Sequence, residues 1–364
     1  MTDESDDGDE SVRVRDEDAF DVGAVSAWLR EHAAPEFAHI VAGVPEVRQF
    51  PGGASNLTYL LRYPAGELIL RRPPVGAKAK GAHDMGREFR IQSALRPVFP
   101  VVPAMVSFCD DDAVIGSDFY VMDKVDGTIL RRELPWPLAP AEVSVLCGRV
   151  WEVLTDLHAV DVDDVPGLAA LGRGEGYVAR QVAGWTDRLS RAATDDLGDW
   201  SDITAWLSGH QPGDVAQRLI HNDYRLDNVV LAPEPSSGSP SVVAVLDWEM
   251  ATVGDPLMDL GGSMAYRIEA GDSDFLQRFR RQPSHVPGMW TRAQIVDRYA
   301  ERSGLSVTPQ QWRFYEVFGV FRLAVIAQQI WYRYFHRQTT NEAYAVFGPA
   351  VRELELRCRA LLEA

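Results

Sequence analysis

The chain has 364 residues, of which 46% are hydrophobic, and its formal net charge is −17 at pH 7. This length is long for one hydrophobic core and suggests two domains. The negative charge argues against general binding of nucleic acid or of anionic membranes, because both would repel the protein.

The acidic charge is concentrated at the N-terminus, where residues 3–18 hold nine carboxylates and two arginines. Such a composition predicts a disordered acidic tail over residues 1–19, and the absence of an apolar core excludes a signal peptide there. The longest apolar region, 314–334, contains Glu316, Arg322 and Arg333 and is not expected to span a membrane. The three cysteines lack metal-ligand spacing, which is typical of reduced packing residues in a cytoplasmic protein.

Residues 20–124 are expected to form the first domain, which consists mainly of strands. Apolar and β-branched runs predict strands at 46–50, 57–63 and 67–71, and short turns would join them into an antiparallel meander. Met85, Phe89 and Leu95 predict a helix after the meander, and 117–122 predicts a further strand.

Residues 125–364 are expected to form a second, mostly helical domain, so the predicted fold class is α+β. An apolar stripe follows Pro140, and capping boxes at Thr291 and Thr308 predict two more helix starts. Two apolar runs, 229–231 and 242–246, flank a loop rich in Pro, Ser and Gly and predict a β-hairpin.

Polar residues lie at both ends of this predicted hairpin. Asn228 precedes the first strand and Asp247 follows the second, and these ends are neighbours in an antiparallel pair. Carboxylate and amide oxygens suit Mg²⁺, and Asp223, five residues before Asn228, can accept a proton from a hydroxyl nucleophile. The set predicts phosphoryl transfer on magnesium. A magnesium-dependent hydrolase, or polar residues that only end the strands, are the alternatives.

The segment HNDYRLDN (221–228), followed by VLDWEMATVGDPLMDLG (245–261), resembles the aminoglycoside phosphotransferase and choline kinase superfamily. The sequence of these motifs is most similar to the branch of the superfamily that is associated with acyl-CoA dehydrogenases. The resemblance covers roughly residues 40–350. It implies a two-lobed protein-kinase-like fold. A small antiparallel-sheet N-lobe would bind ATP, and a larger helical C-lobe would carry the catalytic loop, the Mg²⁺ site and the acceptor pocket. Members of the family usually have Gly where this chain has Asn222, and Asn also tolerates a left-handed backbone.

The resemblance also implies a nucleotide site in the first domain. The loop 52–56 would cover the phosphates, with side-chain contacts from Ser55 and Asn56. Arg71 would bind the phosphates and pair with Glu88, although the neighbouring Arg72 is an alternative. The backbone at Met122, Asp123 and Val125 would form hydrogen bonds with the edge of the adenine ring.

Three further residues receive structural roles. Asp259 is expected, by the same resemblance, to brace the catalytic loop. His158 and His221 are expected to be structural histidines rather than catalysts.

The expected function is therefore an ATP- and Mg²⁺-dependent phosphotransferase acting on a hydroxyl of a small molecule. An aminoglycoside-type antibiotic kinase and a nucleotide-binding regulatory protein without turnover are the alternatives, and the intact Asp223, Asn228 and Asp247 argue against the second. Four arginines among the aromatic residues of the C-terminal half suit an anionic, partly apolar acceptor, unless they are ordinary surface residues: Arg267, Arg322, Arg333 and Arg337. These arginines, together with the resemblance to the branch associated with acyl-CoA dehydrogenases, favour a hydroxyacyl-CoA or a hydroxy acid as the acceptor. The sequence leaves the oligomeric state open.

Overall fold

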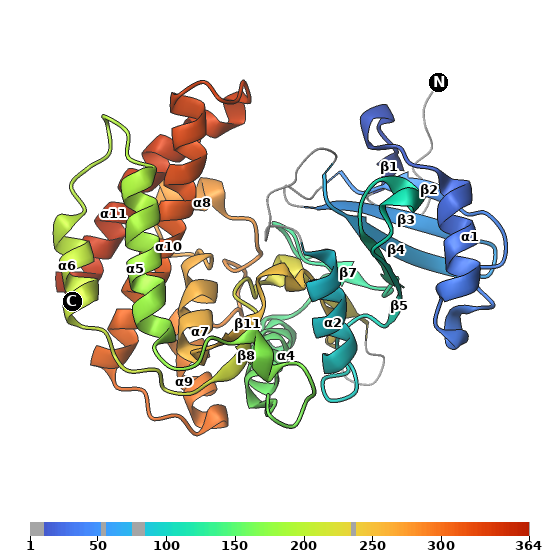
Figure 1. Ribbon diagram of the computed structural model, residues 1–364. Coiled ribbons are helices and arrows are strands. Elements are labelled where there is room, and N and C mark those ends of the chain that lie inside the picture. Colours follow the sequence, from blue (N-terminus) through green and yellow to red (C-terminus); the bar gives the residue numbers. More distant parts are fainter. Residues whose placement is uncertain (1–10, 52–55, 75–83, 234–237, 364) are drawn as a thin grey trace. The chain divides into compact units, whose positions relative to one another are not determined.

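The computed structural model describes residues 11–51, 56–74, 84–233 and 238–363 (Figure 1). The chain divides into two compact units, Met1–Asp126 and Gly127–Ala364. An antiparallel sheet dominates the first unit and helices dominate the second, which confirms the predicted α+β class. The division falls two residues after the expected boundary at 124/125.

The first unit is built on a six-stranded sheet in which every neighbouring pair is antiparallel. The strands, in their order across the sheet, are β1 (Val12–Arg13), β2 (Glu46–Gln49), β3 (Leu57–Tyr63), β4 (Gly66–Arg72), β6 (Phe119–Asp123) and β5 (Met105–Cys109). The predicted meander corresponds to β2, β3 and β4, whereas β1 and β5 were not predicted.

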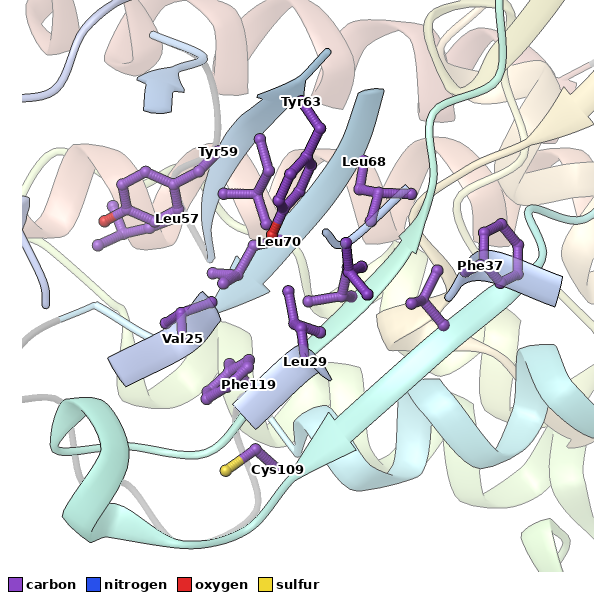
Figure 2. Close-up of a cluster of buried hydrophobic side chains, with 14 residues drawn as sticks. Val25, Leu29, Phe37, Leu57, Tyr59, Tyr63, Leu68, Leu70, Cys109 and Phe119 are labelled. Atoms are coloured by element: carbon purple, nitrogen blue, oxygen red, sulfur yellow. The ribbon is translucent and has the colours of Figure 1, made fainter. Parts of the chain in front are cut away.

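Both faces of this sheet are covered, because its side chains alternate between two cores. On one face, Leu68 and Leu70 of β4 pack with Val25 and Leu29 of α1 (Val22–His32), as Figure 2 shows. On the other face, a smaller cluster includes Ile69 of β4 together with residues of β3, β6 and α2 (Met85–Leu95). The described part of the unit also contains the short segments η2 (Pro35–Phe37) and α3 (Asp112–Ile115). The same alternation places Arg71 and Arg72 on opposite faces.

Residues 11–18 differ from the expected acidic tail of residues 1–19. Val12 pairs with Gln49 across β1 and β2, and η1 (Asp16–Asp18) follows. The amide of Gln49 donates to the Asp18 carboxylate at 2.8 Å, and Arg72 donates to the Asp18 carbonyl at 2.6 Å. Composition suggested a solvated segment, but these buried donors need acceptors, and the segment supplies them.

The second unit contains most of the helices. They are α4 (Pro140–Ala159), α5 (Tyr177–Arg191), α6 (Ser201–Gly209), α7 (Pro256–Ala265), α8 (Asp274–Phe279), α9 (Arg292–Ser303), α10 (Pro309–Phe335) and α11 (Phe347–Glu363). The predicted start at Pro140 and both predicted capping boxes, at Thr291 and Thr308, are confirmed. None of the helices in the described ranges is long and apolar enough to cross a bilayer.

Two small sheets lie among these helices. The predicted hairpin is confirmed as β9 (Val229–Ala232) and β10 (Ser241–Val245), in which Val229 pairs with Val245, and β7 (Thr128–Ile129) extends it. The second sheet pairs β8 (Arg218–Ile220) with β11 (Thr252–Gly254). Short turns of 3₁₀ helix are η3 (Ala169–Leu171), η4 (Leu226–Asn228), η5 (Trp248–Met250) and η6 (Glu342–Val346).

Two glycines allow the backbones of α7 and α10 to touch. A Cβ atom on Gly261 of α7 would lie 2.5 Å from the Tyr315 carbonyl oxygen, and one on Gly319 of α10 would collide with the Gly261 carbonyl. Only glycine fits such an approach. The contact brings together the two helices that carry Asp259 and Arg322, which both reach the 221–228 loop.

Candidate active site

Asp259 fixes the start of the 221–228 loop, which follows β8. Its carboxylate accepts the backbone N–H groups of His221 and Asn222 at 2.7 and 2.8 Å, and His158 Nε2 donates to it at 3.1 Å. Burial alone would raise the pKa of Asp259, but the hydrogen bond and charge of His158 hold this pKa below its usual value. The expected bracing role of Asp259 is confirmed, and so is the structural role of His158, whose other ring nitrogen bonds Tyr299.

His221 is also structural, and its partners identify its tautomer. Nε2 lies 2.9 Å from the Leu246 carbonyl oxygen, and Nδ1 lies 3.3 Å from the backbone nitrogen of Asp223. A carbonyl can only accept and a backbone N–H can only donate, so Nε2 acts as the donor and Nδ1 as the acceptor. The imidazole thus ties the end of β10 to the backbone of Asp223.

Asn222 occupies the left-handed region with φ 64°, a conformation that Asn tolerates better than most residues. Its side chain accepts from the Tyr177 hydroxyl at 3.2 Å and donates to the Met250 carbonyl at 3.1 Å. Its own carbonyl accepts from Arg322 at 2.9 Å. The sharp turn before Asp223 is therefore held from three directions.

Asp223 presents one carboxylate oxygen to the protein and one away from it. Oδ2 accepts from Asn228 Nδ2 at 3.0 Å and lies 3.1 Å from Arg225 Nη2. Oδ1 has no hydrogen-bond donor among the residues that the structure describes. Burial raises the pKa of Asp223, Arg225 opposes this rise, and the charge of Asp247 adds to it. The free oxygen and the raised pKa suit a group that accepts a proton.

Arg225 is a site residue that sequence reasoning missed. Its guanidinium lies between two carboxylates, since Nε is 3.5 Å from Asp227 Oδ1 while Nη2 contacts Asp223. The guanidinium also lies 4.8 Å from the ring centroid of Tyr266, at the end of α7. The alternation of Asp223, Arg225 and Asp227 along the motif was the available signal.

Asn228 and Asp247 meet at one end of the hairpin, as their positions predicted. The Leu246 N–H donates to the Asn228 carbonyl at 2.8 Å, next to the Val229–Val245 pair. The Asn228 amide nitrogen donates to the Asp223 carbonyl and carboxylate, so its oxygen Oδ1 faces away from them. Asp247 has φ 67°, a left-handed turn that directs the chain away from the strand.

This donor set fits Mg²⁺, which prefers oxygen ligands and keeps several from water or phosphate. No group of three His, Cys, Asp or Glu side chains converges on a metal site in the described part of the chain. A magnesium ion held here would therefore rely on the Asp247 carboxylate, the Asn228 amide oxygen and ligands from outside the chain.

The first unit joins three of the predicted nucleotide-site residues in one buried network. Arg71 Nη1 lies 3.1 Å from Glu88 Oε2, which also accepts from the Tyr120 hydroxyl at 2.9 Å. Asn56 Nδ2 donates to Glu88 Oε1 at 3.1 Å. Glu88 is only 1% exposed, so the ion pair is shielded and the guanidinium is held in place. Asn56 thus positions Glu88, and Tyr120 is a member that sequence reasoning missed.

Arg72 belongs to the opposite face of β4. It bonds the Tyr59 hydroxyl and the Asp18 carbonyl, and its guanidinium lies 5.3 Å from the ring centroid of Phe20. Of the two arginines, Arg71 is therefore the one that pairs with Glu88, as predicted.

The other predicted nucleotide-site residues are placed in part. Ser55 and the glycines before it lie outside the described residues. Met122 and Asp123 are at the end of β6 and pair with Ile69 and Leu68 of β4. The backbone of Val125 forms no hydrogen bond to any other described residue, so its N–H and C=O are available to a ligand.

Two of the four arginines that were expected to line an acceptor pocket are structural. Arg267 is 1% exposed and donates to the Trp290 carbonyl. Arg322 holds the Asn222 carbonyl and lies 5.4 Å from the Trp185 ring centroid. Arg333 and Arg337 are exposed near the end of α10. The expected wall of four arginines does not form, because Arg267 and Arg322 are buried against the protein.

Comparison with known proteins gives consistent results. A family model described as "Phosphotransferase enzyme family" matches residues 46–296. The human protein named acyl-CoA dehydrogenase family member 11 is 33% identical over 338 residues, which are 92% of this chain and 42% of the human protein. The chain thus spans less than half the length of this relative.

Two solved structures are similar to this chain. One, from Ralstonia eutropha JMP134 and provisionally described as an aminoglycoside phosphotransferase, has a TM-score of 0.79 and 30% identity, covering 95% of this chain and 99% of that one. The ethanolamine kinase of Plasmodium vivax has a TM-score of 0.56 and 12% identity, covering 91% and 86% of the two chains, which shows a shared fold alone. The resemblance inferred from the motifs is confirmed.

Proposed function

Because the chain belongs to the phosphotransferase enzyme family, we propose that it transfers the γ-phosphoryl group of ATP to a hydroxyl group of a small molecule. The observation that carries the proposal is the placement of Asp223. Its free oxygen Oδ1 lies on the same loop as Asn228, whose amide holds the other oxygen at 3.0 Å. Asp247 follows the paired strand, so base and metal ligands share one end of the hairpin.

Asp223 acts on the acceptor in this proposal. Its carboxylate accepts the proton of the acceptor hydroxyl, the hydroxyl oxygen forms a bond to the γ-phosphorus, and the bond to ADP breaks. The bonds from Arg225 and Asn228 to Oδ2 orient the carboxylate, so that Oδ1 faces the acceptor. Because the transition state is loose, most of the rate enhancement comes from positioning and charge neutralisation.

Asn228 and Asp247 would hold Mg²⁺ through their side-chain oxygens. When bound, the ion neutralises the charge that develops on the phosphates. The chain's own contribution is the hairpin pairing, which keeps the two ligands close before any metal binds.

Arg71 is the proposed cation for the nucleotide phosphates. Glu88 holds it through a buried ion pair, while Asn56 and Tyr120 hold Glu88. A guanidinium held in this way keeps its position, and its planar fork suits phosphate. The free backbone of Val125 is the proposed contact for the adenine edge.

The acceptor is proposed to be a hydroxyacyl-CoA or a hydroxy acid. Support comes from relatives that are named acyl-CoA dehydrogenase family member 11 and match 92% of this chain. A cationic acceptor such as an aminoglycoside would instead need a concentrated acidic pocket.

A cytoplasmic location is also part of the proposal. Cys109, Cys147 and Cys358 are free and buried, which suits a reducing compartment where ATP is available. Cell fractionation that found the protein only in an oxidising compartment would contradict it.

The test is acceptor-dependent release of ADP from Mg-ATP across hydroxyacyl thioesters, hydroxy acids, choline-type amines and aminoglycosides. Turnover with a hydroxylated acceptor, together with Mg-ATP binding weakened about tenfold or more by Asp247→Asn, supports the proposal. Calorimetry with unaltered Mg-ATP binding in Asp247→Asn would remove Asp247 from the metal site. Robust transfer to aminoglycosides would overturn the proposed acceptor and leave the chemistry intact.

A further inference from the structure

A cavity of about 730 Å³ in the second unit concentrates positive charge. Five arginines line it: Arg131, Arg132, Arg278, Arg280 and Arg281. The only carboxylate on its described lining is that of Asp227. The formal charge of the whole chain is −17, so this arginine cavity is an exception to the overall charge. A cavity walled by one sign of charge raises the local concentration of the opposite ion, which indicates an anionic ligand.

Arg280 joins the two chain segments that supply these arginines. It donates to the Arg132 carbonyl at 2.5 Å and to the Glu133 carboxylate at 3.1 Å, and it is 8% exposed. Its charge is thus paired, and its role in the cavity wall is structural.

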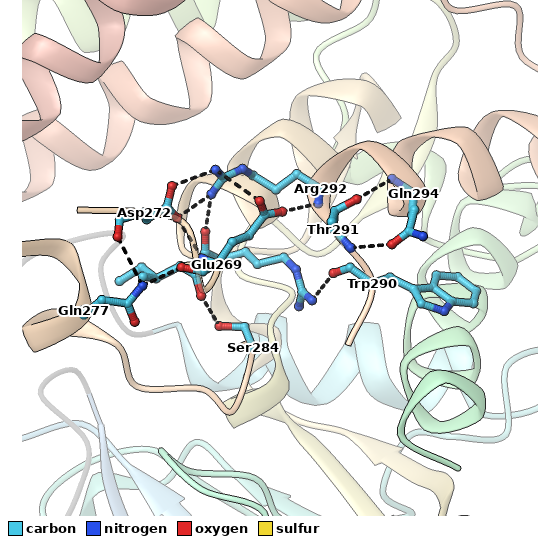
Figure 3. Close-up of polar contacts among 10 residues, drawn as sticks. Glu269, Asp272, Gln277, Ser284, Trp290, Thr291, Arg292 and Gln294 are labelled. Carbon is cyan, nitrogen blue, oxygen red and sulfur yellow. Dashed lines mark hydrogen bonds and ion pairs between the residues drawn. The ribbon is translucent and has the colours of Figure 1, made fainter. Parts of the chain in front are cut away.

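The segment between α7 and α9, which carries α8, is held by the polar network of Figure 3. Arg292 donates to both carboxylate oxygens of Asp272 at 2.8 Å and pairs with Glu269 at 3.5 Å. The Ser284 hydroxyl donates to the Ile268 carbonyl at 2.5 Å. These bonds lie on both sides of α8, so the arginines at and after the end of α8 project from a fixed support.

Two cavity arginines, Arg278 and Arg281, have no charge partner in the part of the chain that the structure describes, whereas the charge of Arg132 acts on the Glu133 carboxylate. Arg132, Arg278 and Arg281 are exposed, and their side chains form no hydrogen bond or ion pair with another described residue. Neighbouring guanidinium groups repel one another, and a bound anion would remove this repulsion. An anionic ligand would therefore supply the charge partner that Arg278 and Arg281 lack within the described part of the protein.

The cavity also approaches the proposed catalytic base. Asp227, on its lining, lies 3.5 Å from Arg225 Nε, and Arg225 Nη2 lies 3.1 Å from Asp223 Oδ2. The Arg225 guanidinium thus lies between the Asp227 carboxylate of the cavity lining and the proposed base Asp223. A molecule bound in the cavity could therefore place another part of itself at Asp223.

The rest of the lining is largely apolar. Phe275 and Phe279 of α8 line the cavity with ring centroids 5.0 Å apart, and Phe347 lines it from the start of α11. A ligand with an apolar segment beside its anionic group would bury surface against these rings.

We propose that the arginine cavity binds a phosphate-bearing part of the acceptor, while the acceptor hydroxyl lies at Asp223. This inference rests on the proposed phosphotransfer. A single carboxylate is matched by one guanidinium fork, whereas several converging guanidiniums match the higher charge and the additional oxygens of a phosphate or pyrophosphate group. Arg132, Arg278 and Arg281 supply these contacts.

The first test is calorimetric binding of inorganic pyrophosphate to the full chain in EDTA, with acetate as the singly charged comparison. The double variant Arg278→Gln/Arg281→Gln is expected to weaken binding of pyrophosphate at least about tenfold, because each charge-assisted hydrogen bond contributes more than a neutral one. The matched control Arg333→Gln/Arg337→Gln removes the same charge from exposed positions off the cavity and should leave binding within about twofold.

Several outcomes would overturn the inference. Pyrophosphate binding that is unchanged in the cavity variant, or that is lost in Arg71→Gln instead, would place the anion elsewhere. Acetate that binds as tightly as pyrophosphate would exclude a phosphate-specific site.

A kinetic measurement separates this inference from the proposed function. With a phosphate-bearing hydroxylated acceptor, the cavity variant should raise the acceptor KM about tenfold with little change in kcat, since uniform binding is lost. If the wild-type chain transfers no phosphoryl group but pyrophosphate binding depends on Arg278 and Arg281, the proposed function fails and the anion site remains. If transfer occurs and the cavity variant matches wild type in both measurements, the anion site fails and the function remains.

Discussion

The 221–228 loop and the arginine cavity belong to the same unit, yet they differ in how their charged groups are paired. In the loop, Asp223, Arg225 and Asp227 form a chain of ion pairs, and Asp259 holds the backbone in front of them. In the cavity, Arg278 and Arg281 have no such partners among the described residues, and Arg132 has only the nearby charge of Glu133. Hydrogen bonds and ion pairs hold the backbone around the cavity, but they do not pair the side chains of Arg278 and Arg281 that line it.

This difference separates two requirements of a transferase. Chemistry depends on the position of one carboxylate to within a fraction of an ångström, so the groups around it must be oriented before the substrate arrives. Recognition of an anion needs charge that has not been neutralised by the protein. Substitutions in the loop should therefore affect rate or folding, and substitutions in the cavity should affect binding alone.

The largest expected effect is that of Asp223→Ala on turnover. Removing the proposed base should lower kcat by about 10²–10⁴-fold, the usual contribution of general base catalysis. Binding of Mg-ATP should stay within about twofold, because Asp223 serves the acceptor. The measurement is steady-state kinetics beside calorimetry. Near-full turnover of this variant on the true acceptor would show that another group is the base.

Asp259→Ala tests the bracing of the loop through stability. Loss of a buried carboxylate that accepts two backbone N–H groups and pairs with His158 should lower the free energy of unfolding by about 3–5 kcal/mol. The pKa of Asp259 lies below its usual value, so this contribution is present above about pH 4 and is lost as the pH falls through the lowered pKa.

Denaturant unfolding would measure this effect. Asp187→Ala, which removes an exposed carboxylate paired with Arg191, is the control and should change stability by less than about 0.5 kcal/mol. Equal losses in the two variants would show that Asp259 does not brace the loop.

Arg71 resembles both regions. Its side chain is paired with Glu88, as the charges of the loop are paired, and it is also proposed to bind phosphate, as the cavity arginines are. Arg71→Ala should raise the apparent KM for ATP about tenfold or more and lower turnover, since a charge-assisted contact is lost. Arg72→Ala should change the KM for ATP much less, because Arg72 is on the other face of β4. Kinetics at varied ATP concentration would measure both effects. A larger effect of Arg72→Ala would show that the phosphate contact lies on the Arg72 face of β4 and not on the Arg71 face.

The smallest expected effect is a shift in the pH profile of Arg225→Gln. Burial raises the pKa of Asp223, and the positive charge of Arg225 opposes this rise. Without that charge the pKa of Asp223 should rise further, so the acid limb of kcat/KM should move to higher pH. A profile that moves to lower pH, or does not move, would contradict the assignment of Asp223 as the titrating base.

Local patterns predicted the parts of the site that depend on adjacent residues. The hairpin, and with it the meeting of Asn228 and Asp247, follows from two apolar runs around a turn-rich loop. The Arg71–Glu88 pair follows from strand alternation and the motif resemblance. Residues 11–18 were expected to be disordered because their acidic composition gives no sign of the partners, Gln49 and Arg72, that bind them.

The arginine cavity could not be predicted in this way. Arg132 and Arg280 are separated by almost 150 positions, and the contact between them depends on how the segment before α4 meets the end of α8. The aromatic–arginine chemistry that was expected for the acceptor occurs in the chain, but at different residues. Arg322, which was expected to face the acceptor, instead bonds the Asn222 carbonyl, because a left-handed turn leaves that oxygen without an internal partner.

The order of residues 11–18 has a practical consequence for anyone who shortens this chain. Cutting at residue 20, where composition alone would place the boundary, removes the edge strand β1 and the acceptors of two buried side chains, Gln49 and Arg72. Arg72 follows Arg71 on β4, so the loss would be felt on the strand that also carries the phosphate-binding candidate. A protein trimmed there is expected to bind nucleotide more weakly, because β4 loses contacts on one face. The boundary for such work is best placed before residue 11.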